Sequence, residues 1–303
     1  MAHEATARLP HMSLNDYAAN VFSQNGEDGI LEEIFTRLPG GLSDERWCVE
    51  FGAWDGVYLS NTCKLIRQHG FKAVLIEGDP AKVIDLERNF PEETVYKICE
   101  FVGLEGGSTL DRIMARTPIP QDFDVLSIDI DGCDYWILDS LKDYQPKVIV
   151  IEFNPSIPNE VDFVQEPDFS IKHGASPRSL CTLAQQKGYS LVATTACNLF
   201  FVRNDFVHFV AAEGETLTLE ALRDDNDARV FLFSGFDGFL YLSRDFPMRW
   251  HSHMVETTEL QAIPALFRKY PYDWGRARRV LWRGYERYTL ARRITRSTLR
   301  NMR

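Results

Sequence analysis

The chain has 303 residues and a formal net charge of −11 at pH 7, with 45% hydrophobic and 25% charged residues. This length fits one large domain or one domain with an extension, and the composition is ordinary for a globular protein in water. No apolar run approaches the roughly 20 residues of a membrane span, and the first residues lack the apolar core of a secretory signal. The six cysteines have no CxxC spacing, which argues against a zinc knuckle and predicts a reducing, cytoplasmic location.

The charge is distributed unevenly along the chain. Residues 276–303 contain ten arginines and one glutamate, a local charge of +9, which leaves −20 for the other residues. An acidic body argues against a nucleic-acid partner. The basic end predicts either peripheral contact with an anionic inner membrane surface, or packing against the acidic body or a sister subunit in a homo-oligomer.

Apolar runs alternate with helical patterns from residue 20 to residue 205. Expected helices cover residues 23–38, 59–70, 81–90, 108–117, 135–144 and 176–188, and expected strands cover residues 46–51, 72–80, 94–102, 123–131, 147–154, 189–195 and 198–203. Such alternation predicts an α/β fold with a doubly wound, mostly parallel sheet covered on both faces. The last two strands are close enough in sequence for an antiparallel hairpin at the sheet edge.

The alternation stops near residue 206. Two short strands are expected around Gly235 and Gly238, followed by a helix over residues 259–270 and an Arg-rich C-terminal helix with Leu281, Tyr285 and Tyr288 on one stripe. We therefore predict three parts, which are an N-terminal tail over 1–19, a domain over 20–205 and an accessory region over 206–303.

The loop "EFGAWDG", residues 50–56, follows the first strand. Ligands of such sheets bind beyond the carboxyl ends of the strands, and Gly52 allows the backbone to approach a ligand closely. The chain has no GxGxxG and no GxxxxGK[ST] motif. Glu77 ends the second strand, where a carboxylate can bind both ribose hydroxyls, and Glu50 can hold an ammonium group. These features suit S-adenosylmethionine, whereas a plain strand-to-helix turn is the alternative.

Several segments resemble, in order and spacing, the FkbM-type class I methyltransferases. They are "SQNGEDGI", "EFGAWDGVYLSNT", "LIEGDP", "LSIDIDG", "IEFN" and "HGASPRSLCTLAQQKGYSLV", followed by "NLFFVR". The resemblance covers about residues 20–204, and it implies a Rossmann-like, seven-stranded sheet, S-adenosylmethionine as methyl donor, and methylation of an oxygen on a sugar or polyketide-like product. The cofactor-binding residues that it implies are Gln24, Glu50, Gly52, Ala53, Asp55, Gly56, Asn61, Glu77 and Asp79.

A second polar site is expected at the ends of the fourth and fifth strands. Asp129 and Asp131 are two residues apart and would share one face of a strand, as would Glu152 and Asn154. Oxygen ligands from adjacent strand ends suit Mg²⁺ or Mn²⁺, so we predict a metal bound by Asp129, Glu152 and Asn154. Alternatively, Asp131 starts a simple turn and Glu152 pairs with a basic residue.

Two residues compete for the role of general base. His173 lies in the loop after the fifth strand and suits proton transfer near neutral pH, whereas Asp131 is the competing base and a surface role for His173 is the alternative. His251 and His253 have an HxH spacing but no third ligand nearby in the sequence.

Together these patterns predict an S-adenosylmethionine-dependent O-methyltransferase acting on a sugar or polysaccharide hydroxyl, with or without a divalent metal. Its acceptor would be a glycan or a glycan-like small molecule. A nucleotide-cofactor oxidoreductase and a non-catalytic glycan-binding or scaffold protein are the other functions that the sequence leaves open.

Overall fold

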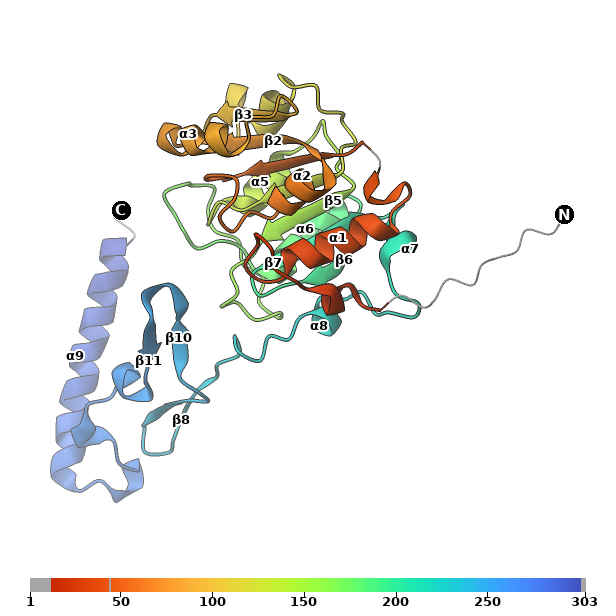
Figure 1. Ribbon diagram of the computed structural model, residues 1–303. Coiled ribbons are helices and arrows are strands. Elements are labelled where there is room, and N and C mark those ends of the chain that lie inside the picture. The colour runs from red at the N-terminus through yellow and green to blue at the C-terminus, as the bar shows by residue number, and fades with distance from the viewer. Residues whose placement is uncertain (1–11, 44, 301–303) are drawn as a thin grey trace. The chain divides into compact units, whose positions relative to one another are not determined.

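The computed structural model describes residues 12–43 and 45–300. The chain divides into two compact units, Met1–Ala228 and Arg229–Arg303 (Figure 1). Among the described residues, no helix is both long and apolar enough to cross a membrane.

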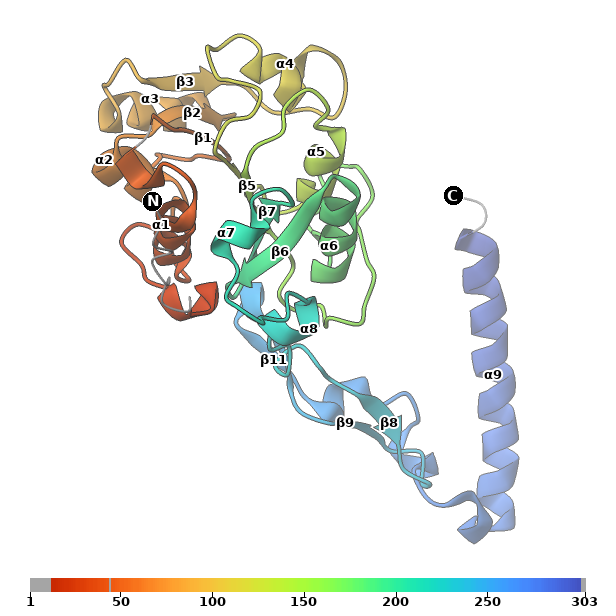
Figure 2. The same cartoon turned by 90° about the vertical axis from the view of Figure 1, so that its right-hand side faces the viewer.

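Seven strands of the first unit form one sheet in the order β3-β2-β1-β4-β5-β7-β6. Strands β1 to β5 pair in parallel, whereas β7 is antiparallel to both β5 and β6 (Figure 2). The predicted mostly parallel sheet and its antiparallel final pair are therefore confirmed. The strands are β1 Trp47–Phe51, β2 Lys72–Glu77, β3 Val95–Cys99, β4 Val125–Ile128, β5 Val148–Glu152, β6 Tyr189–Thr194 and β7 Asn198–Arg203.

Both faces of this sheet are buried under helices. Alternate strand residues enter opposite apolar layers, with Val49 and Leu126 in one and Cys48 and Val125 in the other. Helices α4, α5 and α6 contribute to the first layer and α1, α2 and α3 to the second. The helices of this unit are α1 Glu27–Arg37, α2 Cys63–His69, α3 Pro80–Asn89, α4 Leu110–Met114, α5 Asp134–Ser140, α6 Pro177–Gln186, α7 Val207–Val210 and α8 Leu219–Leu222.

The ends of the first unit extend beyond the expected segment of 20–205. Residues 1–11 of the expected tail lie outside the described residues, but Leu14 is fully buried in an apolar layer. Val210, Leu219 and Leu222 are also buried in these layers. Apolar burial therefore places residues 206–228 with the first unit, although the sequence pattern grouped them with the accessory region.

The second unit contains two short hairpins and one long helix. The expected strands around Gly235 and Gly238 are present as β8 Leu232–Ser234 and β9 Leu240–Leu242, and a further hairpin pairs β10 Phe246–Met248 with β11 His253–Val255. The helix expected over 259–270 is not formed. Only 3₁₀ turns at Thr257–Leu260 and Ala265–Phe267 occur there, because Pro264 has no N–H for a continuous helix. The Arg-rich helix is α9, Arg276–Arg300.

Candidate active site

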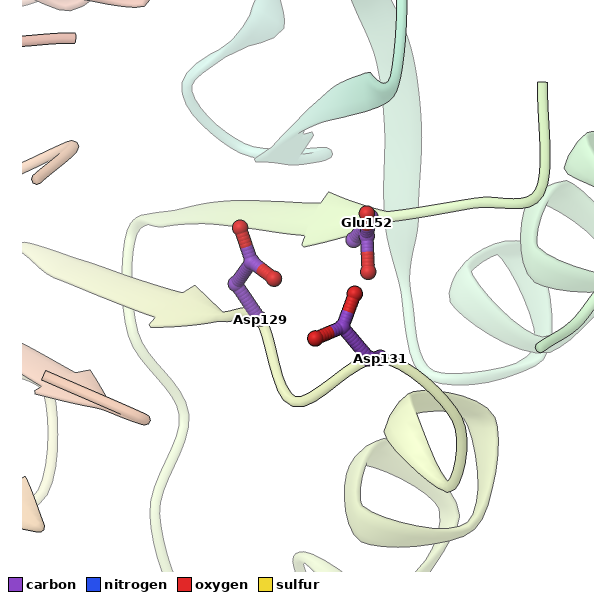
Figure 3. A group of neighbouring side chains, drawn as sticks. All are labelled: Asp129, Asp131 and Glu152. Atoms are coloured by element: carbon purple, nitrogen blue, oxygen red, sulfur yellow. The ribbon is translucent and has the colours of Figure 1, made fainter. Parts of the chain in front are cut away.

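Three carboxylates meet at the carboxyl ends of β4 and β5. One oxygen from each of Asp129, Asp131 and Glu152 lies within 4.8 Å of the others (Figure 3). Glu152 is the last residue of β5 and Asp129 directly follows β4, so two neighbouring parallel strands bring them to one edge. Asp131 arrives differently from the prediction, because β4 ends at Ile128 and Asp131 has a left-handed φ of 55°. A turn, and not strand alternation, directs its carboxylate towards the other two.

The cluster is electrostatically strained. Burial, followed by repulsion from nearby carboxylates, raises the pKa values of both Asp129 and Glu152. Asp134, at the start of α5, is fully buried as well, and burial raises its pKa to about 6 although the backbone N–H groups of Ile130 and Gly132 donate to it. Carboxylates gathered in this way need a shared proton or a cation to balance their charge.

Asn154, the third predicted metal ligand, is bonded within its own loop. Its Nδ2 donates to the carbonyl of His173 at 2.9 Å, and its Oδ1 accepts from the backbone N and the Oγ of Ser156 at 3.0 and 2.6 Å. These bonds fix the amide beside the loop that carries His173. Metal binding by Asn154 stays a prediction.

The loop that carries His173 is held by Gln165, a residue that belongs to none of the predicted motifs. His173 is exposed, and its backbone N–H donates to the buried Oε1 of Gln165 at 2.9 Å. The Nε2 of Gln165 donates to the carbonyls of Asp168 and Ile171, and it lies 3.3 Å from the Sγ of Cys133 at the start of α5. Gln165 therefore connects the His173 loop to the turn that follows Asp131. A single buried glutamine in a loop leaves no periodic signal in a sequence.

Glu50, at the end of β1, is buried and already has three hydrogen-bond donors. It accepts from Ser60 Oγ at 2.6 Å, from the backbone N of Asn61 at 2.9 Å and from Thr62 Oγ1 at 2.7 Å. Burial nevertheless raises its pKa. The Nδ2 of Asn61 donates in turn to Ser127 Oγ on β4 at 3.1 Å. Glu50 and Asn61 thus connect β1, the start of α2 and β4.

The two glycines of the first loop make close approaches inside the protein. Gly52 has a φ of +71°, and a Cβ there would lie 2.2 Å from the carbonyl oxygen of Asp129. Gly56 has a φ of +73°, and a Cβ there would lie 2.5 Å from the ring of Phe90. Between them, the buried Ala53 donates its N–H to the carbonyl of Ile76 at 3.2 Å. The first loop therefore touches both the second strand and the acidic cluster.

Glu77 fastens the first loop to the end of β2. Its Oε2 accepts from the backbone N of Trp54 at 2.8 Å, and its Oε1 accepts from the backbone N of Asp79 at 2.8 Å. Each carboxylate oxygen can accept a second hydrogen bond, which is what a ribose diol requires. Asp79 itself caps α3 by accepting from Ala81 N at 2.9 Å.

Asp55 and Gln24 complete the predicted cofactor set. Asp55 Oδ1 accepts from the backbone N–H groups of Val57 and Tyr58, at 2.9 and 2.8 Å, and so shapes the loop. Gln24 lies just before α1, with its Nε2 3.9 Å from the Sγ of Cys197. The carbonyl oxygen of Cys197 accepts a hydrogen bond of 2.8 Å from the backbone N–H of Phe153, the residue that follows Glu152. Cofactor contact by either residue stays a prediction.

Outside this region, the HxH histidines show no metal geometry. His253 Nε2 lies 3.7 Å from Glu259 Oε1, and both side chains are exposed. In the described part of the chain, Asp129, Asp131 and Glu152 form the only group of three or more histidine, cysteine or acidic residues with this proximity.

The seven-stranded, mostly parallel sheet with helices on both faces is a Rossmann-like fold. Residues 107–191, which include the acidic cluster and His173, match the family model described as the Methyltransferase FkbM domain. Over these residues the match confirms the predicted resemblance, and it indicates a methyltransferase of the FkbM type. The match favours a methyltransferase over the oxidoreductase. An acceptor molecule is implied by the same class.

Similar solved structures include several methyltransferases. An S-adenosylmethionine-dependent methyltransferase from Aquifex aeolicus is 13% identical over 58% of this chain and 88% of that chain, with a TM-score of 0.35. The CMeT domain of the citrinin polyketide synthase is 12% identical over 58% of this chain and 51% of that chain, with a TM-score of 0.37. LepI in complex with S-adenosylmethionine is 12% identical over 61% of this chain and 49% of that chain, with a TM-score of 0.39. This chain thus spans about half the length of the last two. No curated protein sequence matches it.

Proposed function

We propose that this methyltransferase acts on a hydroxyl oxygen of a sugar or polysaccharide, and that a divalent cation, Mg²⁺ or Mn²⁺, assists it. The observation that carries the proposal is the convergence of Asp129, Asp131 and Glu152 within 4.8 Å. All three offer hard oxygen ligands, which Mg²⁺ and Mn²⁺ prefer. Burial and repulsion between carboxylates raise the pKa values of Asp129 and Glu152, and a bound cation would relieve this repulsion.

The metal would be held by Asp129 and Glu152, with Asp131 or Asn154 as a further ligand. When bound, such a cation lowers the pKa of a sugar hydroxyl and orients it. The proposed cofactor site lies beside it, because Gly52 touches the backbone of Asp129. Glu77 would bind the ribose, and the loop from Gly52 to Gly56 would surround the methionine part. Glu50 would act there through its bonds to residues 60–62.

His173 is the proposed general base. If Asp131 serves as a ligand, its lone pairs are engaged, which leaves His173 as the nearby group that suits proton transfer near neutral pH. The acceptor oxygen attacks the methyl carbon in line, so that the O–CH₃ bond forms as the S–CH₃ bond breaks. The sulfonium becomes the neutral thioether of S-adenosylhomocysteine, and the hydroxyl proton passes to the imidazole of His173.

A release assay for S-adenosylhomocysteine tests this proposal. The protein is incubated with S-adenosylmethionine and a panel of glycans, in EDTA and with added Mg²⁺ or Mn²⁺. We expect turnover with at least one hydroxyl acceptor, and we expect it to require the metal. Turnover that is unchanged in EDTA would remove the metal assignment.

A pair of histidine variants tests the base. His173→Ala should lower kcat by roughly 10²–10⁴-fold, whereas His251→Ala, which also removes an exposed histidine, should leave kcat unchanged. Equal activity of both variants would exclude His173 as the base.

A further inference from the structure

Helix α9 carries an arginine face that its own unit leaves uncovered. Arg276, Arg279, Arg283 and Arg287 recur three or four residues apart, and all four are exposed. At 1.5 Å per residue, this face is roughly 17 Å long. Figure 1 shows α9 as a single long helix.

The opposite side of α9 is anchored within its own unit. The ring of Trp282 lies 5.2 Å from the rings of both Phe267 and Trp274. Tyr285 also stacks on Phe267, and its hydroxyl donates to the carbonyl of Ala262 at 3.0 Å. These contacts fix the rotation of the helix, so the arginine face points away from the aromatic cluster.

The arginine face is not neutralised within its own unit. Among the described side chains of residues 229–292, none of the four guanidinium groups has a carboxylate partner, and α9 contains a single acid, Glu286. Like charges one turn apart repel one another and destabilise a helix. An external anionic surface would remove this repulsion.

We propose that the arginine face docks on the anionic phospholipid headgroups of a bilayer. Apolar side chains of the same unit favour lipid over a polyanion such as nucleic acid. Val280 and Leu290 are 67% and 60% exposed beside the arginines, and Phe236, in the turn between β8 and β9, is 92% exposed. Phosphate groups alone give no favourable interaction with exposed apolar side chains. A lipid interface stabilises both the apolar side chains and the arginines.

The charge distribution supports the same partner. Residues 229–303 carry a net charge of +9, whereas residues 1–228 carry −20. An anionic bilayer therefore attracts the second unit and repels the first. This contact would be peripheral, and it is independent of the proposed acceptor.

Vesicle sedimentation of the full chain tests the docking. The vesicles contain phosphatidylcholine alone, or phosphatidylcholine with about 30% phosphatidylserine. We expect the protein to bind the anionic vesicles only, and to dissociate as salt is added. The quadruple variant R276Q/R279Q/R283Q/R287Q should lose roughly a hundredfold or more in partition coefficient, at about fivefold for each arginine.

A matched variant separates charge from folding. R276K/R279K/R283K/R287K keeps the charge and should bind anionic vesicles nearly as the parent does, and Phe236→Ser should weaken binding without changing its salt dependence. Far-UV circular dichroism and turnover of a soluble acceptor should be the same for all variants. Equal binding by the Gln and Lys variants, or binding of the parent to neutral vesicles, overturns the proposal. The proposal is also overturned if no variant binds vesicles and the Gln variant instead loses self-association or RNA binding.

Discussion

Replacing Asp129 by asparagine tests the electrostatic strain of the acidic cluster. The change keeps the size of the side chain and removes one of three carboxylates whose oxygens lie within 4.8 Å of one another. Because burial and neighbouring negative charges raise the pKa of Asp129, its ionised form is unfavourable in the folded, metal-free protein. We therefore expect Asp129→Asn to stabilise the metal-free fold, although it removes a proposed ligand.

The separation sets the size of the effect. Two unit charges 4.8 Å apart repel by about 3.5 kcal/mol in a medium with an effective dielectric constant of about 20. Protonation and access of water to the exposed Asp131 reduce this value. We expect a gain of roughly 1–3 kcal/mol in the free energy of unfolding, or about 2–10 °C in the melting temperature of a unit of this size.

The direction of the pKa shifts determines how the stability of the metal-free protein depends on pH. A carboxyl group whose pKa is raised in the folded state keeps its proton at a pH where the unfolded chain has lost it. Stability is therefore lost as pH rises from about 4, the ordinary carboxyl pKa, through the folded-state values of Asp129 and Glu152. The metal-free parent should lose more stability than Asp129→Asn between about pH 5 and pH 8.

Denaturant unfolding followed by circular dichroism, in EDTA and in Mg²⁺, measures these differences. Mg²⁺ should stabilise the parent at about pH 8 and should have little effect on Asp129→Asn. Asp131→Asn makes the same change at the exposed member of the cluster, where asparagine tolerates the left-handed backbone. We expect it to give a smaller gain in stability, because water screens an exposed carboxylate. The reasoning fails if Asp129→Asn destabilises the metal-free protein at about pH 8, or if the two variants behave alike.

Three further substitutions probe the loops around the cluster. Glu77→Ala should weaken S-adenosylmethionine binding at least tenfold by calorimetry, because two backbone donors and the proposed ribose site lose their acceptor; unchanged affinity would remove the ribose assignment. Gly52→Ala should destabilise the fold by roughly 1–3 kcal/mol, measured by denaturant unfolding, because its Cβ would lie 2.2 Å from the Asp129 carbonyl at a φ of +71°; a neutral result would contradict this packing. Gln165→Ala should release the loop of His173. In steady-state kinetics we expect the KM for the acceptor to rise while the KM for the cofactor stays the same. Equal changes in both constants would show only general loosening.

The sheet was predictable because burial on both faces leaves a clear pattern. Strands such as β4 and β5 are short apolar runs, and each is followed by polar residues where the chain leaves the sheet. Since the carboxyl ends of parallel strands share one edge, Asp129 and Glu152 were expected to meet, and they do. Asp131 was placed correctly for the wrong reason, because the left-handed turn that directs it begins after the strand has ended.

Other features depend on contacts between distant residues and left no local pattern. The three donors to Glu50 come from residues 60–62, so its bonding depends on how the loop folds back over β1. Gln165 receives its role from His173 in its own loop and from Cys133, which lies 32 residues earlier in the chain. The helix expected over 259–270 is not formed for a local reason, since the apolar spacing favours a helix but Pro264 has no N–H to continue it.

The close approach at Gly52 was predictable, but the group that approaches it was not. A sequence pattern indicates that Gly52 must lack a side chain, but it does not identify what approaches it. In the structure the approaching group is the carbonyl oxygen of Asp129, so the proposed cofactor loop and the acidic cluster are in direct backbone contact. Glu77 holds the other side of that loop through the N–H of Trp54. A displacement of this loop would therefore shift the backbone that carries Asp129, and the proposed methyl donor and acceptor sites would not move independently.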